Sequence, residues 1–230
     1  MTKLKSFGCS FIFGDDLKDT FLEEDPWSAY TWPALLAQHL GLRHECYAQS
    51  GSGNLQILDS LLNNIDDSDT ALYVIGWTWI DRFDYNDPIS SQWRTVRPTD
   101  TDSVAQNYYK QLHSQYQDKF TALSYISTAV TTLLARGHKF IMTCQDPLIF
   151  ETEWHTSQAV QTLQNYVRPY VTTFEGMSFL EWSRHNGYAI SPAWHPLESA
   201  HQAAFKYIKN HCKEIDLVQW PAACYLTHSQ

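Results

Sequence analysis

The sequence predicts an α/β protein, a three-layer α/β/α sandwich around a mostly parallel sheet of about five strands. Three short apolar segments with turn residues behind them have the length and composition of buried strands, at residues 4–8, 71–76 and 138–143. Segments with helical spacing of apolar residues lie between them. Strands that alternate with helices in this way predict a parallel sheet covered on both faces.

The remaining elements follow in chain order. Two weaker strand candidates lie at residues 44–48 and 188–190. Helices are predicted at residues 27–40, 54–64, 103–136, 157–167, 176–186 and 197–212. The second of these ends in an acidic turn at 66–69, and the third, the longest, ends at Arg136 with Gly137 just beyond it. The segment from Asp81 to Asp102 is polar and interrupted by proline, which favours a long loop on the substrate side.

Length and composition indicate one domain, spanning 1–230. A chain of 230 residues buries roughly 70% of its unfolded surface around one core, and no linker or repeat divides this one. A net charge of −9 without a basic cluster disfavours nucleic acid and anionic membranes as partners. Nine Trp, thirteen Tyr and eleven Phe favour a ring-lined cleft as well as a large core.

The cysteines and the N-terminus predict a soluble, cytoplasmic protein. The five cysteines are scattered without the spacing of a zinc site: Cys9, Cys46, Cys144, Cys212 and Cys224. We therefore expect reduced thiols, no metal and no cofactor. The N-terminus lacks a signal-peptide cleavage site, and no apolar run approaches the ~20 residues that span a bilayer.

The turns behind the predicted strands carry chemically active residues. Ligands of open parallel sheets bind beyond the carboxyl ends of the strands. The turns there read Gly8-Cys9-Ser10, Ser50-Gly51-Ser52-Gly53-Asn54 and Gly76-Trp77-Thr78. A serine nucleophile needs a general base and donors for the oxyanion. His195, which precedes a proline and the last helix, suits the first task, and backbone N–H groups of the glycine-rich turns suit the second.

These residues resemble the sequence blocks of the SGNH (GDSL-type) hydrolases, in the right order along the whole chain. The first block matches Gly8-Cys9-Ser10, the second matches Gly51 with Asn54 nearby, and the fifth matches His195 followed by Pro196. The resemblance implies a serine esterase or acyltransferase that acts on a small acylated substrate, such as a glycan or peptide ester, through an acyl-serine intermediate. The oxyanion would be held by the N–H groups of Ser10 and Gly51.

Two positions depart from the family pattern. The third block has Thr78 where the family has an asparagine, so Asn54 or Thr78 is expected to supply the missing donor. Pro192 stands three residues before His195, where the family has an aspartate. Ser10 and His195 are therefore predicted to act as a dyad, with a main-chain carbonyl to orient the imidazole.

Substrate binding is predicted near the third block and the base, at Trp77, Asp81, Arg82 and Trp194. An alternative function is a catalytically silent binding module that keeps the fold and holds a ligand in an aromatic cleft, which the missing aspartate and asparagine favour. Cys9 is a second candidate nucleophile, but its side chain is expected on the opposite face from that of Ser10. His201 is predicted to be a packed or surface histidine within a helix. The oligomeric state is left open.

Overall fold

The computed structural model describes residues 1–20, 25–66 and 70–213. Within these residues the main sheet has five parallel strands in the order β2-β1-β3-β6-β7. They are β1 (Lys3–Gly8), β2 (Arg43–Cys46), β3 (Ala71–Trp77), β6 (Lys139–Cys144) and β7 (Val171–Thr172). The predicted α/β class and the mostly parallel sheet are confirmed.

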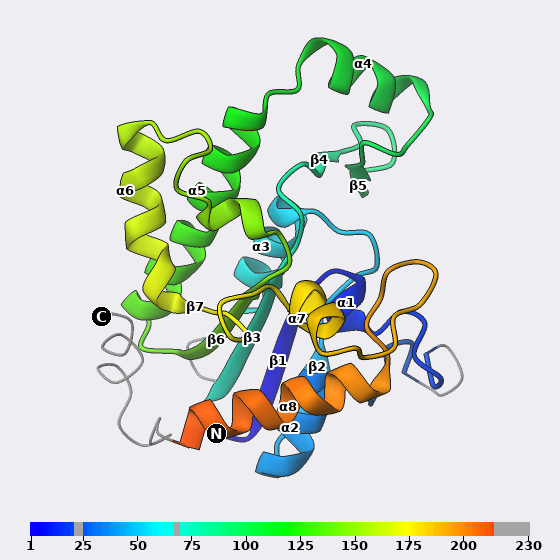
Figure 1. The fold of residues 1–230 in the computed structure, drawn as a ribbon, viewed down its shortest axis with the longest axis vertical. Helices are drawn as coiled ribbons and strands as arrows, with labels where there is room; N and C mark the ends of the chain where they lie inside the picture. The colour runs from blue at the N-terminus through cyan, green and yellow to red at the C-terminus, as the bar shows by residue number, and fades with distance from the viewer. Residues whose placement is uncertain (21–24, 67–69, 214–230) are drawn as a thin grey trace.

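Helices cover both faces of this sheet and make the three layers (Figure 1). One face carries α1 (Ser10–Phe13), α2 (Trp32–Leu40), α7 (Phe179–His185) and α8 (Glu198–Lys213). The other carries α3 (Asn54–Asn64), α5 (Gln115–Ala135) and α6 (Gln158–Val167), with short 3₁₀ turns η1 (Pro147–Phe150) and η2 (Arg168–Tyr170) nearby. Every residue of β3 is buried, which explains its continuous apolar sequence.

The polar segment after β3 is folded into a hairpin. β4 (Phe83–Asn86) and β5 (Trp93–Val96) pair antiparallel, where the sequence predicted a loop. Together with α4 (Ser103–Gln111) this hairpin projects beyond the carboxyl end of the sheet, away from the N-terminus (Figure 1). The substrate-side location of the segment is therefore compatible with the prediction, but its form is not.

Three predicted elements have different bounds or places. The fifth strand is β7; residues 188–190 contribute only a bridge from Ile190 to Pro196. The long helix of 103–136 is two helices, since α4 ends at Gln111 and α5 begins at Gln115; between them His113 Nε2 lies 2.7 Å from Asp118 Oδ2. The helix of 27–40 begins only at residue 32, since the Thr31 hydroxyl caps its N-terminus.

Two predictions fall partly or wholly outside the described residues. They are the acidic turn at 66–69, beyond residue 66, and the free thiols of Cys212 and Cys224. Cys9, Cys46 and Cys144 carry free thiols. Across the described ranges, no helix has the length and apolar character needed to cross a membrane.

Candidate active site

Ser10 lies directly behind the central strand β1. The strand ends at Gly8, Cys9 precedes the helix, and Ser10 is the first residue of the one-turn helix α1. The last residue of β1 has to be glycine, because a Cβ on Gly8 would approach Ile12 Cγ1 of α1 to 2.5 Å. The N–H groups at the start of a helix have no partner within it, so the Ser10 N–H faces away from its own helix.

The structure brings His195 against Ser10 across a separation of 185 residues. His195 Nε2 lies 3.0 Å from Ser10 Oγ, within the range of a nucleophile and its general base. Phe11 holds the imidazole from the side, with the two rings perpendicular at 5.5 Å. The predicted serine and histidine therefore meet. Cys9, the other candidate nucleophile, is fully buried in the core.

A carboxylate completes the arrangement, and sequence reasoning missed it. Asp16 Oδ2 lies 2.7 Å from His195 Nδ1. An ionised carboxylate only accepts hydrogen bonds, so Nδ1 carries the proton and Nε2 is left to accept from the Ser10 hydroxyl. Three side chains thus form a hydrogen-bonded Ser–His–Asp chain in place of the predicted dyad. The signal available in the sequence was an acidic pair, Asp15 and Asp16, a few residues behind the serine.

The backbone conformation of Gly14 and Asp16 places the Asp16 carboxylate beside the His195 imidazole. Gly14 ends α1 in the left-handed region and returns its N–H to the Ser10 carbonyl at 2.7 Å. Asp16 is itself left-handed, with φ of 66°, a conformation that aspartate tolerates better than most residues. Hydrogen bonds from Ser191, at 2.6 Å, and from His195 hold the pKa of Asp16 below its usual value. The carboxylate is therefore ionised at neutral pH.

The predicted oxyanion glycine lies in a turn beside Ser10. Ser52 N–H donates to the Gln49 carbonyl at 3.2 Å, and Gly51 at the third position has φ of 82°, which defines a type II turn. Gln49 N–H in turn donates to the Gly8 carbonyl at 3.0 Å, which extends the β1–β2 pairing as far as this turn. The Ser50 hydroxyl donates to Asp15, so the acidic pair anchors both the glycine turn and the base.

Asn54 and Thr78 are joined to each other. Asn54 Oδ1 accepts from the Thr78 N–H at 2.9 Å, while Nδ2 donates to the carbonyls of Thr78 and Trp79 at 3.3 and 3.4 Å. Both ends of this amide are engaged, so Asn54 positions the end of β3 and does not offer a free donor. It does not cap α3 either: Gly53 is the cap residue, and Asp84 of β4 accepts from the N–H groups of Gly53 and Gln56.

The predicted substrate-binding residues occupy different surroundings. Trp77 is fully buried on the face opposite α1, where it packs in the core, so its side chain is placed away from Ser10. Arg82 donates to the Ser52 carbonyl at 2.8 Å and stacks its guanidinium on Trp79. Trp194 is 58% exposed beside the base, with the guanidinium of Arg184 4.0 Å from its ring centre.

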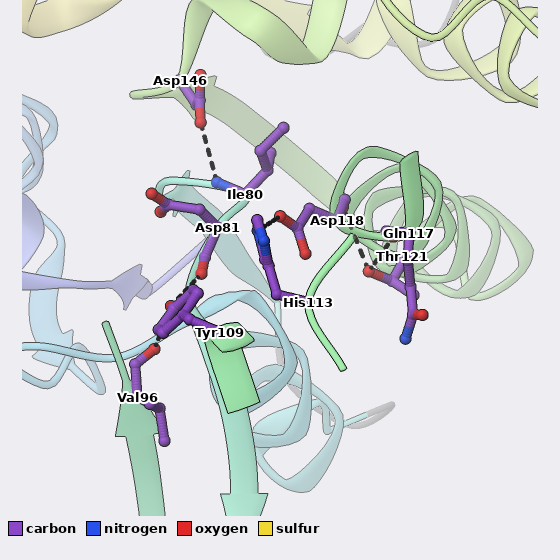
Figure 2. A network of polar contacts seen from close by, with 9 residues as sticks. All are labelled: Ile80, Asp81, Val96, Tyr109, His113, Gln117, Asp118, Thr121 and Asp146. Carbon is purple, nitrogen blue, oxygen red and sulfur yellow. Dashed lines mark hydrogen bonds and ion pairs between the residues drawn. The ribbon is translucent and has the colours of Figure 1, made fainter. Parts of the chain in front are cut away.

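Asp81 belongs to a polar network at the base of the projecting hairpin (Figure 2). Its carbonyl accepts from the Tyr109 hydroxyl at 2.6 Å, and its carboxylate points away from the His113–Asp118 pair. Burial raises the pKa of the Asp81 carboxyl. The main-chain contact shows that this residue helps to fix the segment behind β3.

A small polar hollow lies between α3, β4, α4 and α5 and is lined in part by Asn54, Arg82 and Asp118. Its charged groups are already bonded within the protein: Arg82 to Ser52, Asp84 to the N–H groups of Gly53 and Gln56, and Asp118 to His113. Within the described residues no group of three or more His, Cys, Asp and Glu side chains is arranged to hold a metal ion.

The fold is that of the SGNH (GDSL-type) hydrolases, in divergent form. The chain is similar to TesA, with a TM-score of 0.55 at 15% identity over 92% of this chain and 98% of that one. It is similar to a lipolytic protein of the G-D-S-L family from Desulfitobacterium hafniense, with a TM-score of 0.50 at 12% identity over 91% and 99% of the two chains.

A third similar structure is a carbohydrate esterase whose active site displays divergent catalytic and non-catalytic binding functions. Its TM-score is 0.54 at 14% identity, over 98% of this chain and 67% of that one. No family model and no curated protein matches the sequence.

Proposed function

We propose that this protein is a serine esterase that cleaves a small acylated substrate through an acyl-Ser10 intermediate. The observation that supports the proposal most strongly is the chain of hydrogen bonds from Ser10 through His195 to Asp16, at 3.0 and 2.7 Å. These are the contacts that activate a serine hydroxyl at neutral pH. They also favour an enzyme over the silent binding module, since the absent family aspartate has a substitute.

The proposed reaction follows from the proton positions. Ser10 Oγ attacks the ester carbonyl while its proton passes to His195 Nε2, and Asp16 stabilises the resulting imidazolium. The carbonyl oxygen becomes an oxyanion beside the Ser10 N–H and the Gly51 turn. His195 then returns the proton to the leaving alcohol as the C–O bond breaks. In the second half, His195 takes a proton from water, whose oxygen attacks the acyl-serine. The bond from the acyl carbon to Ser10 Oγ then breaks, and His195 returns the proton to Oγ, which releases the acid and restores Ser10. An acceptor alcohol in place of water gives acyl transfer.

The substrate is proposed to be an acylated sugar or a similarly ringed alcohol. The exposed ring of Trp194 adjoins the base, and one of its faces is covered by Arg184 while the residue still remains 58% exposed. An open aromatic face of this kind suits the apolar face of a sugar ring or an aryl group on the leaving side. The carbohydrate esterase among the similar structures supports the same class.

The test replaces Ser10 and uses a second serine as the matched control. Ser6 Oγ also contacts a histidine, His44 Nε2, at 2.8 Å, but Ser6 is fully buried and burial lowers the pKa of His44 to about 4. Ser10→Ala is expected to abolish hydrolysis of p-nitrophenyl acetate and of acetylated monosaccharides, and labelling by a fluorophosphonate probe. Ser6→Ala should keep both. Wild-type labelling that survives Ser10→Ala would remove Ser10 from the mechanism.

A further inference from the structure

Three buried polar side chains at the carboxyl edge of the sheet, on or just behind β3 and β6, have atoms with no hydrogen-bond partner among the described residues. They are the hydroxyls of Thr78 and Thr143 and both the oxygen and the nitrogen of the Gln145 amide. Thr78 is 0% and Gln145 is 2% exposed. A buried amide that makes no hydrogen bond lowers stability, because the loss of its bonds to water is not compensated. Such a group is retained at a cost to stability, which is typical of residues that serve a ligand.

The strand register brings the residues that follow β1, β3 and β6 to the same edge of the sheet. Gly8 of β1 pairs with Gly76 of β3, and Gly76 pairs with Thr143 of β6. Ser10 and Gln145 each lie two residues beyond the outer members of this row, and Thr78 lies two residues beyond the middle one. The Gln145 N–H donates to the Trp77 carbonyl at 2.9 Å, so the β3–β6 pairing continues to this point.

The side chains of this row share the face on which α1 lies. A Cβ on Gly76 would meet Ile12 of α1 at 2.5 Å and the Thr143 hydroxyl at 3.8 Å. Because side chains alternate along a strand, Gln145 points to the same face as Thr143. Its amide needs to cover only one strand spacing, ~5 Å, to lie over the end of β3 between Gln145 and Ser10.

We propose that the Gln145 amide, assisted by the Thr78 hydroxyl, donates a hydrogen bond to the oxyanion that forms when Ser10 attacks the substrate carbonyl. This inference rests on the proposed esterase function. Both ends of the Asn54 amide are already bonded, so that side chain cannot supply the donor. Gln145 carries the same functional group on the next strand. Gln145 and Ser10 are both shielded from bulk solvent, at 2% and 4% exposed.

The experiment separates catalysis from folding with two glutamine variants. Gln145→Met removes an unpaired amide at nearly constant volume. Gln164→Met is the matched control, because Gln164 is 3% exposed, lies on α6, and donates to the carbonyls of Ile149 and Glu151 at 2.9 and 3.1 Å. Steady-state kinetics with p-nitrophenyl acetate and the melting temperature are measured for both proteins.

For Gln145→Met we expect kcat to fall about 100-fold or more with little change in KM, as when one oxyanion donor is lost. Its melting temperature should stay the same or rise. Gln164→Met should show the reverse, a lower melting temperature and an unchanged kcat. The inference is overturned if Gln145→Met keeps the wild-type kcat, or if it loses kcat together with a fall in melting temperature like that of the control.

The proposed function and this inference fail in different ways. A wild-type protein that shows no Ser10-dependent hydrolysis or labelling would contradict the esterase function and leave no oxyanion for Gln145 to bind. Ser10-dependent labelling that proceeds at the wild-type rate in Gln145→Met would contradict the role of Gln145 alone.

Discussion

Replacing Asp16 by asparagine tests whether the carboxylate found in the structure does the work of the absent family aspartate. The substitution keeps the size of the side chain and removes its charge. Asp16 accepts from His195 Nδ1 at 2.7 Å and from the Ser191 hydroxyl at 2.6 Å. In the variant the imidazolium loses its counter-charge, and the new amide N–H favours the tautomer in which Nε2 carries the proton and cannot accept from Ser10.

The size of the expected loss in kcat/KM depends on how strongly water screens the attraction between the Asp16 carboxylate and the His195 imidazolium. Opposite unit charges about 4 Å apart attract by about 1 kcal/mol in water and about 4 kcal/mol near a protein surface. The Asp16 side chain is 43% exposed and that of His195 is 16% exposed, so an intermediate value of about 2–3 kcal/mol applies. This converts to a loss of about 100-fold in kcat/KM, less than the ~10⁴-fold typical of a buried triad acid.

The assay is the pH dependence of kcat/KM on p-nitrophenyl acetate, with the rate of fluorophosphonate labelling as a second readout. Because hydrogen bonds lower the pKa of Asp16, its carboxylate is ionised across pH 6–8, so Asp16→Asn removes a charge that the wild-type protein carries over that whole range. Asp19→Asn is the control: Asp19 accepts from the Ala29 N–H at 2.7 Å in the same region and has no contact with the imidazole. Wild-type kcat/KM in Asp16→Asn would refute the triad and restore the dyad.

Three further predictions concern the fold around the site. Gly76→Ala places a Cβ 2.5 Å from Ile12 Cγ1 and should lower the unfolding free energy in urea by about 1–3 kcal/mol; Ile12→Ala should restore part of it, and strictly additive losses would contradict the clash. Asp84→Ala strips the acceptor from the Gly53 N–H, which lies 3.0 Å away, and should cost about 1–3 kcal/mol by the same measurement, whereas an unchanged midpoint would deny that Asp84 anchors α3. Burial lowers the pKa of His201 to about 3, so the folded state excludes a proton that the unfolded state binds. Stability should then fall as the pH drops from about 6.5 toward 3, by up to about 1.4 kcal/mol per pH unit, and His201→Gln should flatten that slope; identical slopes would show that His201 does not contribute.

The sequence was most informative where strands are buried on both faces. Residues 71–76 and 138–143 read as continuous apolar runs because β3 and most of β6 contact helices on each side. The position of Ser10 followed from the end of β1 in the same way. β7 was missed because two residues, Val171 and Thr172, are too short to show any periodicity.

The hairpin and the break in the long helix depend on contacts distant in sequence. β4 and β5 are four residues each and mostly half-exposed, so their alternation is weak, and Asp84 is fixed by bonds to the start of α3 about 30 residues earlier. Residues 112–114 contain no glycine or proline to mark a helix end. The break lies where α5 begins anew at Gln115, beside the His113–Asp118 contact, which spacing alone does not specify.

Asp16 shows why the acid was the hardest part of the site to predict. The expected position, three residues before His195, assumes that the chain approaches the imidazole from that side. Here Ser191 closes the turn instead: its N–H donates to the His195 carbonyl at 2.8 Å, and its hydroxyl accepts from the His195 N–H at 3.1 Å while donating to Asp16. The turn therefore presents Nδ1 to the loop behind Ser10.

Any loop at this edge of the sheet could supply a carboxylate there, and a separation of 179 residues between Asp16 and His195 carries no local signal. The proton on His195 Nδ1 requires an acceptor, whichever loop supplies it. When the motif aspartate is missing, the structure should therefore be searched for another carboxylate along the carboxyl edge of the sheet before activity is taken to be lost.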